Sequence, residues 1–146
     1  MMTLLDVSAL DSEKCCALFS IKPEYAERIL TGEKKFEFRT VLLKRSVSSV
    51  YIYATAPICA VVGKFELQQI AVGSAKEVWT YTCQFAGIEE DAFFSYYSGK
   101  KKAVAYCVTN PVRFATPYPL SVFSLSRPPQ SFAYVESMQL SKRDCP

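Results

Sequence analysis

A lysine, a glutamate and an arginine lie close together within residues 32–39 of the chain, which read Gly-Glu-Lys-Lys-Phe-Glu-Phe-Arg. If this segment is a strand, Glu37 and Arg39 share its polar face and Phe36 and Phe38 share the other, because successive side chains alternate. An arginine on a strand can bind a phosphate or a base edge with its planar guanidinium, and a neighbouring carboxylate can orient it. From spacing alone, the simpler interpretation is a surface ion pair worth about 0–1 kcal/mol.

Positive charge is concentrated in the same part of the chain. The 146 residues have a formal net charge of +3. Residues 22–45 contain seven basic and four acidic side chains, so they alone carry +3: Lys22, Arg28, Lys34, Lys35, Arg39, Lys44 and Arg45 against Glu24, Glu27, Glu33 and Glu37. The rest of the chain is neutral in sum. Local clustering of this kind is what makes a mildly charged protein attractive to an anionic ligand.

Composition restricts the chemistry further. The chain has six cysteines without a CxxC pair and no histidine, which excludes a Cys/His zinc site. We find no glycine-rich phosphate loop and no Ser–His–Asp set, and we expect no metal and no cofactor. Without histidine, acid–base catalysis at neutral pH would need Lys34, Glu37 or a tyrosine with a strongly shifted pKa.

Apolar patterns predict the elements that position these side chains. Pro23 and Gly32 bracket an amphipathic helix over residues 24–31, and Ser74-Ala75-Lys76-Glu77 is a capping box that opens a second helix. We expect strands at 16–21, 34–39, 49–55, 60–70, 103–108 and 130–135, a loop at 40–49, and helices at 24–31, from 74 toward 85, and from 89 to 99.

The order of these elements predicts an α+β fold, a small and partly open β-barrel of about six strands with peripheral helices. We assign residues 15–136 to one domain, 1–14 to an N-terminal leader and 137–146 to a C-terminal tail. The N-terminal residues carry acids and no early basic cluster, and no apolar run approaches the ~18 residues of a membrane helix. With cysteines interpreted as reduced core residues, we expect a soluble, cytoplasmic protein without a membrane partner.

The segment 32–39 also matches a known motif. Gly32-x-Lys34-x-x-Glu37-x-Arg39 matches the GxKxxExR signature of ASCH domains, a branch of the PUA-like β-barrels. Blocks at 20–26, 51–54, 62–66 and 128–132 resemble the family in the same order, so the resemblance covers roughly residues 16–136. It implies a PUA-like barrel whose cleft lies between the first helix and the barrel. It also implies that Lys34, Glu37 and Arg39 face that cleft.

The resemblance implies a role in RNA recognition, since the family is generally regarded as RNA-binding and is linked to transcription coactivation and translation. We therefore predict a regulatory binding module that holds RNA or a nucleotide-like ligand in a basic cleft. Its ligand-binding residues would be Lys22, Lys34, Glu37 and Arg39, with Ser131 approaching the same cleft. Affinity should fall with added salt, because phosphate contacts release counterions. Ser131 has the alternative interpretation of a polar residue on an edge strand.

An enzyme is the alternative function. Some bacterial members of the family are reported to cut RNA, and one branch hydrolyses acetylcytidine. A small ribonuclease or nucleoside amidohydrolase would use Lys34 and Glu37 as its acid–base pair. The amidohydrolase branch carries threonine at the position of Glu37, so its hydroxyl nucleophile is missing here. A protein-interaction adaptor using the acidic residues 89–91 is a third interpretation.

Aromatic and basic groups outside this segment have two interpretations each. The aromatic set suits base stacking, but aromatics at helical spacing are typically core anchors. The core interpretation is applied to Trp79, Phe93, Phe94, Tyr96 and Tyr97, and also to Tyr25 and Tyr53. Residues 100–102 are three lysines that follow a helix end, and lysines in such a position are typically solvated. Alternatively, they could extend a phosphate-binding surface. No feature of the sequence indicates an oligomeric state.

Overall fold

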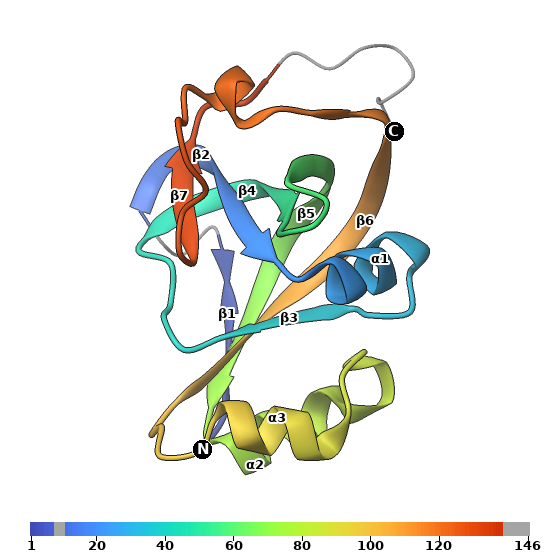
Figure 1. Cartoon of the computed structure of the whole chain (residues 1–146). Coiled ribbons are helices and arrows are strands. Elements are labelled where there is room, and N and C mark those ends of the chain that lie inside the picture. The colour runs from blue at the N-terminus through green and yellow to red at the C-terminus, as the bar shows by residue number, and fades with distance from the viewer. Residues whose placement is uncertain (8–10, 139–146) are drawn as a thin grey trace.

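One mixed sheet forms the centre of the molecule (Figure 1). The computed structural model describes residues 1–7 and 11–138. Its strands are β1 (Thr3–Asp6), β2 (Asp11–Ile21), β3 (Phe36–Arg39), β4 (Arg45–Ala54), β5 (Ala60–Gly73), β6 (Ala103–Tyr118) and β7 (Phe132–Val135). Its helices are α1 (Pro23–Thr31), α2 (Ala75–Thr82) and α3 (Glu90–Tyr96), with short 3-10 turns at Cys83–Phe85 and Leu120–Phe123.

The strand order is β3-β6-β5-β4-β2-β7, and β1 pairs with β5 outside this path. The sheet is not closed into a barrel, so β3 and β7 remain its two edge strands. The α+β, PUA-like fold predicted from the sequence is confirmed, with seven strands instead of about six. The open edge matters for function because β3 carries the glutamate and the arginine of the sequence motif.

Local sequence signals account for the helix boundaries. The helix α1 has Pro23 at its first position and ends at Gly32, whose φ of 88° is left-handed and whose amide donates to the carbonyl of Ile29. The helix α2 begins with the predicted capping box, in which Ser74 and Glu77 satisfy each other's backbone amides. The first signal sets the end of α1, shortly before β3, and the second sets the start of α2, directly after β5.

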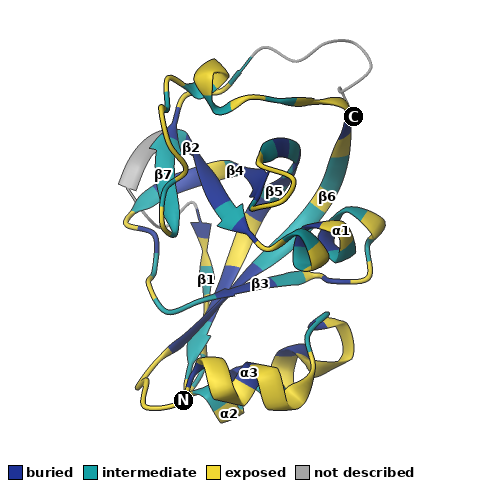
Figure 2. Ribbon diagram, viewed as in Figure 1, coloured by how far each residue is buried: buried dark blue, intermediate teal, exposed yellow. Residues whose placement is uncertain are grey.

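The core consists of packed apolar clusters on the two sides of the sheet. The central cluster lies between the strands and α1 and includes Phe19, Ile29 and Tyr106. A second cluster, built around Phe38 and Phe93, packs α2 and α3 against β3 and β6. Figure 2 shows the consequence, in which the strands are largely buried and the outer faces of α2 and α3 are exposed. Among the described residues, no helix combines the length and apolar character needed to span a bilayer.

Three segments differ from the sequence-based expectations. Residues 3–6, placed in the leader, form β1 and pair with β5. The strand β4 begins at Arg45, inside the expected loop. The strand β6 continues through Pro111 and Pro117 to Tyr118, beyond its expected end at residue 108. Proline is tolerated there because β3 pairs only with residues 104–107 of β6, so the outer edge beyond them forms no ladder with β3.

The cysteines also differ from their expected places. Of the five in the described part of the chain, Cys16 alone is buried, Cys15 and Cys107 are half-buried, and Cys59 and Cys83 are exposed. All five are free thiols. The interpretation as core residues therefore holds for Cys16 and is wrong for the two exposed thiols. Cys145 and residues 139–146 of the expected tail lie outside the described residues.

Candidate functional site

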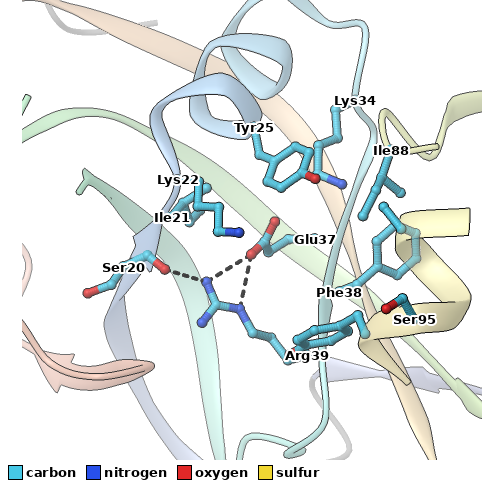
Figure 3. Close-up of a pocket in the computed structure, with 12 residues that line it drawn as sticks. Ser20, Ile21, Lys22, Tyr25, Lys34, Glu37, Phe38, Arg39, Ile88 and Ser95 are labelled. Atoms are coloured by element: carbon cyan, nitrogen blue, oxygen red, sulfur yellow. Dashed lines mark hydrogen bonds and ion pairs between the residues drawn. The ribbon is translucent and has the colours of Figure 1, made fainter. Parts of the chain in front are cut away.

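A cavity of about 440 Å³ lies where the end of β2, the helix α1, the edge strand β3 and the helix α3 meet (Figure 3). Its wall contains three cations against one carboxylate, together with apolar and hydroxyl-bearing side chains. The lining residues are Ser20, Ile21, Lys22, Tyr25, Lys34, Glu37, Phe38, Arg39, Ile88, Ala92, Ser95 and Tyr96. Below we call this cavity the β3 pocket. Four of the five predicted ligand-binding residues line it.

The pocket wraps around an edge strand, which is why it collects residues from both faces of β3. Strand alternation sends Glu37 and Arg39 to one side and Phe38 to the other. Because β6 is the only strand that pairs with β3 among residues 1–7 and 11–138, the other edge of β3 is open to α1 and α3. Side chains from both faces of the strand therefore reach one cavity.

Lys34 is the most deeply buried charged group of the pocket, with an exposed fraction of 2%. Its Nζ donates a hydrogen bond to the carbonyl of Ala86 at 2.7 Å. The same Nζ lies 4.6 Å from the ring centre of Phe38 and 5.2 Å from that of Tyr25. Burial lowers the pKa of Lys34 to about 8, against the opposing effect of Glu37. The amine is therefore close to half-protonated at mildly alkaline pH.

A short stretch of backbone between the 3-10 turn and α3, residues 85–88, covers Lys34, and we call it the strap. The amide of Lys35 donates to the carbonyl of Phe85 at 2.9 Å, and Arg28 Nη1 donates to the carbonyl of Gly87 at 2.8 Å. Gly87 has a φ of 64°, and a Cβ on it would lie 2.4 Å from Cβ of Lys34. Only glycine permits both this backbone conformation and this close approach. The strap therefore excludes water from the lysine.

Arg39 joins three parts of the chain that are distant in sequence. Its Nε and Nη2 contact Oε2 of Glu37 at 3.0 and 2.8 Å, and its Nη2 donates to the carbonyl of Ser20 at 2.7 Å. Its Nη1 donates to Oγ of Ser131 at 3.0 Å and to the carbonyl of the same residue at 3.2 Å. These contacts involve all three nitrogens of the guanidinium. Arg39 thus holds β3 against β2 and the start of β7.

Glu37 is buried as well, with an exposed fraction of 6%. Within the described part of the chain, both contacts from Arg39 go to Oε2. Figure 3 shows the other carboxylate oxygen turned toward the cavity, with the amines of Lys22 and Lys34 on the α1 side. A fixed carboxylate oxygen between two amines can accept a proton or a hydrogen bond from a bound ligand.

The structure thus brings Lys22, Lys34, Glu37 and Arg39 together at one cavity. Ser131 is not among the lining residues and meets the site through Arg39. Phe93 and Tyr97 are core residues, as interpreted.

Sequence reasoning missed several lining residues. Tyr25 and Tyr96 both line the cavity. Tyr25 also packs against the central core, as predicted, whereas Tyr96 is 47% exposed. Tyr25 carried one available signal, a polar hydroxyl at the margin of the apolar stripe of α1. Ser20 and Ser95 carried no signal, because their neighbours in the cavity are remote in sequence.

Comparison with known proteins finds similar sequences and structures. No family model matches the chain. The chain is 29% identical over 135 residues to the ASCH domain-containing ribonuclease of Zymomonas mobilis, covering 86% of this chain and 88% of that protein. It superimposes on the crystal structure of ASCH from Zymomonas mobilis with a TM-score of 0.74 and 28% identity, over 86% of this chain and 90% of that one. The chain is therefore similar to ASCH proteins in both sequence and fold.

A further relative of the chain is longer, and the match covers only part of it. The large ribosomal subunit protein uL22 of Ureaplasma parvum is 27% identical over 120 residues, which is 82% of this chain and 39% of that protein. The Zymomonas ASCH protein, in contrast, matches this chain over nearly its whole length, and it is therefore the more informative comparison for the β3 pocket.

Proposed function

We propose that the β3 pocket binds one nucleotide of a single-stranded RNA, and that this binding serves a regulatory role in the cytoplasm, in transcription or translation. The observation that carries the proposal is a lysine buried to 2% exposure at the wall of a 440 Å³ cavity. Burying a cation costs free energy unless an anion is paired with it. Buried ionisable groups with shifted pKa values are concentrated at functional sites, so Lys34 is a candidate functional residue. The similarity to a protein named as a ribonuclease supports RNA as the ligand.

The contacts of each residue suggest distinct roles. Lys22 and Lys34 would contact a phosphate, because both residues line the pocket and carry amines (Figure 3). Glu37 would accept a hydrogen bond from a ribose hydroxyl or a base amino group through its free oxygen. Arg39 would act as a positioning residue, since protein groups already engage its donors. Ser131 would act with Arg39.

Fluorescence anisotropy with a labelled RNA hexamer tests the binding proposal. We expect the Lys34→Met variant to bind at least about tenfold more weakly than the wild type, because one buried charge contact is lost. Lys76→Met is the matched control: Lys76 is an exposed lysine on α2 outside the β3 pocket, and we expect less than about a twofold change. Gel electrophoresis afterwards confirms that the RNA is intact. Equal affinity of all three proteins would rule the proposal out.

RNA cleavage is a second candidate, favoured by the lysine whose pKa is lowered to about 8 and by the ribonuclease relative. The 2′-oxygen of the bound nucleotide would attack the adjacent phosphorus while its proton passes to Glu37. The bond from phosphorus to the 5′-oxygen would break, and that oxygen would take a proton from Lys34. The products would be a 2′,3′-cyclic phosphate and a free 5′-hydroxyl. Nucleoside amide hydrolysis has no comparable support, since glutamate replaces the threonine.

Incubation of the purified protein with a labelled RNA tests this candidate. We expect cleavage by the wild type, and no cleavage by Lys34→Met or Glu37→Gln prepared in the same way. A single 2′-O-methyl group at the cleaved position should block the reaction, because it removes the nucleophile. RNA that is bound but stays intact would leave the binding module as the function of the chain.

A further inference from the structure

The helix α3 forms one wall of the β3 pocket and presents an exposed tyrosine at its rim. Ile88, Ala92, Ser95 and Tyr96 line the cavity from this side. Tyr96 is the last residue of α3, and its exposed fraction is 47%. An exposed aromatic side chain that also lines a basic cavity is placed to meet whatever projects from that cavity.

Tyr96 lies near the ion pair between Glu37 and Arg39, because all three residues line the β3 pocket. Burial raises the pKa of its hydroxyl, Arg39 lowers it and Glu37 raises it, so both charged groups lie within electrostatic range. On its inner side, Tyr96 packs edge-on against Tyr97, with 4.8 Å between the ring centres. Tyr97 is itself fixed, because its hydroxyl donates to the carbonyls of Arg39 at 2.8 Å and Val104 at 3.3 Å. The ring of Tyr96 therefore packs on one side against a fixed ring, that of Tyr97.

Three exposed lysines follow this tyrosine within six residues. The chain turns after α3, where the amide of Lys100 donates to the carbonyl of Tyr97 at 2.9 Å. Lys100, Lys101 and Lys102 are exposed in the turn that leads into β6. A row consisting of a basic cavity, an aromatic side chain and then several cations matches the needs of single-stranded nucleic acid, which alternates bases with phosphates.

We propose that the RNA strand leaves the β3 pocket across the C-terminal end of α3, with the next base stacked on Tyr96 and later phosphates near Lys100–Lys102. This inference rests on the proposed function and names its substrate class, an RNA of several nucleotides instead of a mononucleotide. An acidic protein segment and an RNA strand would both be attracted to these lysines. Only the RNA also has bases that can stack on the tyrosine and enter the adjoining pocket, so we favour RNA as the occupant.

Binding of RNAs of different length tests the path. We expect a labelled pentanucleotide to bind more tightly than a labelled mononucleotide. Tyr96→Ala should weaken pentanucleotide binding by about 5- to 150-fold, the range measured for loss of one base–aromatic stack, and by a larger factor than it weakens mononucleotide binding. Tyr96→Phe should retain the affinity, because stacking needs the ring and not the hydroxyl.

Tyr81→Ala is the matched control. Tyr81 is an exposed tyrosine on α2, with an exposed fraction of 43%, and it does not line the β3 pocket. We expect this variant to bind both RNAs like the wild type. Thermal unfolding of each variant shows whether the substitution has disturbed the fold.

The lysine run has a separate readout in the salt dependence of binding. Replacing Lys100, Lys101 and Lys102 with glutamine should reduce the slope of log affinity against log salt by up to about 2, because each phosphate contact on a single strand contributes about 0.7. Lys76→Gln should leave the slope unchanged. These variants keep the β3 pocket intact, so mononucleotide binding should persist in all of them.

The outcomes separate this inference from the proposed function. If Tyr96→Ala and the triple variant bind the pentanucleotide as tightly as Tyr81→Ala does, the path across α3 is wrong while RNA binding in the pocket stands. If neither RNA binds the wild type, the proposed function fails and the path fails with it. Equal affinity of the wild type for one and five nucleotides also overturns the path.

Discussion

Among the groups that line the β3 pocket, the amine of Lys34 has the pKa that is changed most by its surroundings. Its neighbours are a carbonyl, two aromatic rings and the strap, and they stabilise a cation less well than water does. Burial therefore lowers its pKa to about 8. Such a lysine changes charge within the pH range in which RNA and protein are both stable, so its role can be followed by titration.

We predict that RNA affinity falls as pH rises through about 8. Below this pKa, Lys34 is charged and attracts phosphate; above it, the free protein must first take up a proton in order to bind. Anisotropy titrations between pH 6.5 and 9.5 measure this dependence. The Lys22→Gln variant should show the same pH dependence with weaker binding, whereas Lys34→Met should lose the dependence. Loss of the dependence in both variants would assign it to another group.

The ion pairs of Arg39 and Arg113 allow the stability contributed by a buried ion pair to be compared with that of an exposed one. Arg39 and Glu37 have side chains exposed by 11% and 8%, and Arg113 and Glu27 have side chains exposed by 49% and 57%. We predict that Arg39→Ala lowers the free energy of unfolding by about 3 kcal/mol, because Glu37 is left buried and unpaired. Arg113→Ala should cost about 0.5 kcal/mol. Urea unfolding measures both, and similar losses would contradict the positioning role of Arg39.

At the scale of elements, the strap over Lys34 connects the helical layer to the pocket. Its carbonyls accept hydrogen bonds from the backbone of Lys35 and from the side chains of Lys34 and Arg28. It therefore links the turn before β3 to the start of α3. Because α3 also forms a wall of the pocket, the helical layer both closes the cavity and sets the environment of its lysine.

Alanine substitutions at Gly87 and Gly99 distinguish two contributions to the loss of stability, a steric clash and a strained backbone conformation. Both have left-handed φ values, 64° and 75°, but a Cβ on Gly99 meets nothing within 4 Å. We predict that Gly99→Ala costs about 1 kcal/mol from backbone strain alone. Gly87→Ala should cost about 1–3 kcal/mol more, because the added methyl group collides with Lys34.

The same substitution should change the titration of Lys34. Displacing the strap admits water, so the pKa of Lys34 should rise from about 8 toward the ordinary value near 10.4 in Gly87→Ala and stay unchanged in Gly99→Ala. NMR titration of the lysine ε-methylene resonance measures it. An unchanged pKa in Gly87→Ala would show that the strap is not what dehydrates the amine.

At the scale of the whole molecule, the sheet is open between its two edges, and a side chain spans the opening. Arg39 on the edge strand β3 contacts the carbonyl of Ser20 at the end of β2 and Ser131 just before β7. These hydrogen bonds take the place of a backbone ladder between the edges. The gap that remains beside β3 is the space in which the β3 pocket forms.

The N-terminal residues take part in this architecture. Val7 has an exposed fraction of 5% and belongs to the central core, while Leu4 on β1 is 46% exposed. We predict that Val7→Ala lowers the free energy of unfolding by about 1–2 kcal/mol through lost burial, and that Leu4→Ala changes it by less than about 0.5 kcal/mol. Thermal or urea unfolding measures the difference. An unchanged free energy of unfolding in Val7→Ala would show that burial of Val7 does not stabilise the core.

Much of the local structure was predictable from the sequence alone. Proline and glycine placed the ends of α1, the capping box placed the start of α2, and alternation placed Glu37 and Arg39 together on β3. These signals act between residues close in the chain, and the family motif then indicated that they face a cleft. The α+β class followed from the order of the elements.

Only the tertiary structure decided how these residues are used. The lowered pKa of Lys34 depends on its burial beneath the strap, and the contacts of Arg39 depend on Ser20 and Ser131. The pocket positions of Tyr25 and Tyr96 and the path of β6 through its prolines depend equally on distant partners. The physical reason is common to all: burial and hydrogen bonding arise between segments far apart in sequence, where neither periodicity nor residue spacing carries a signal.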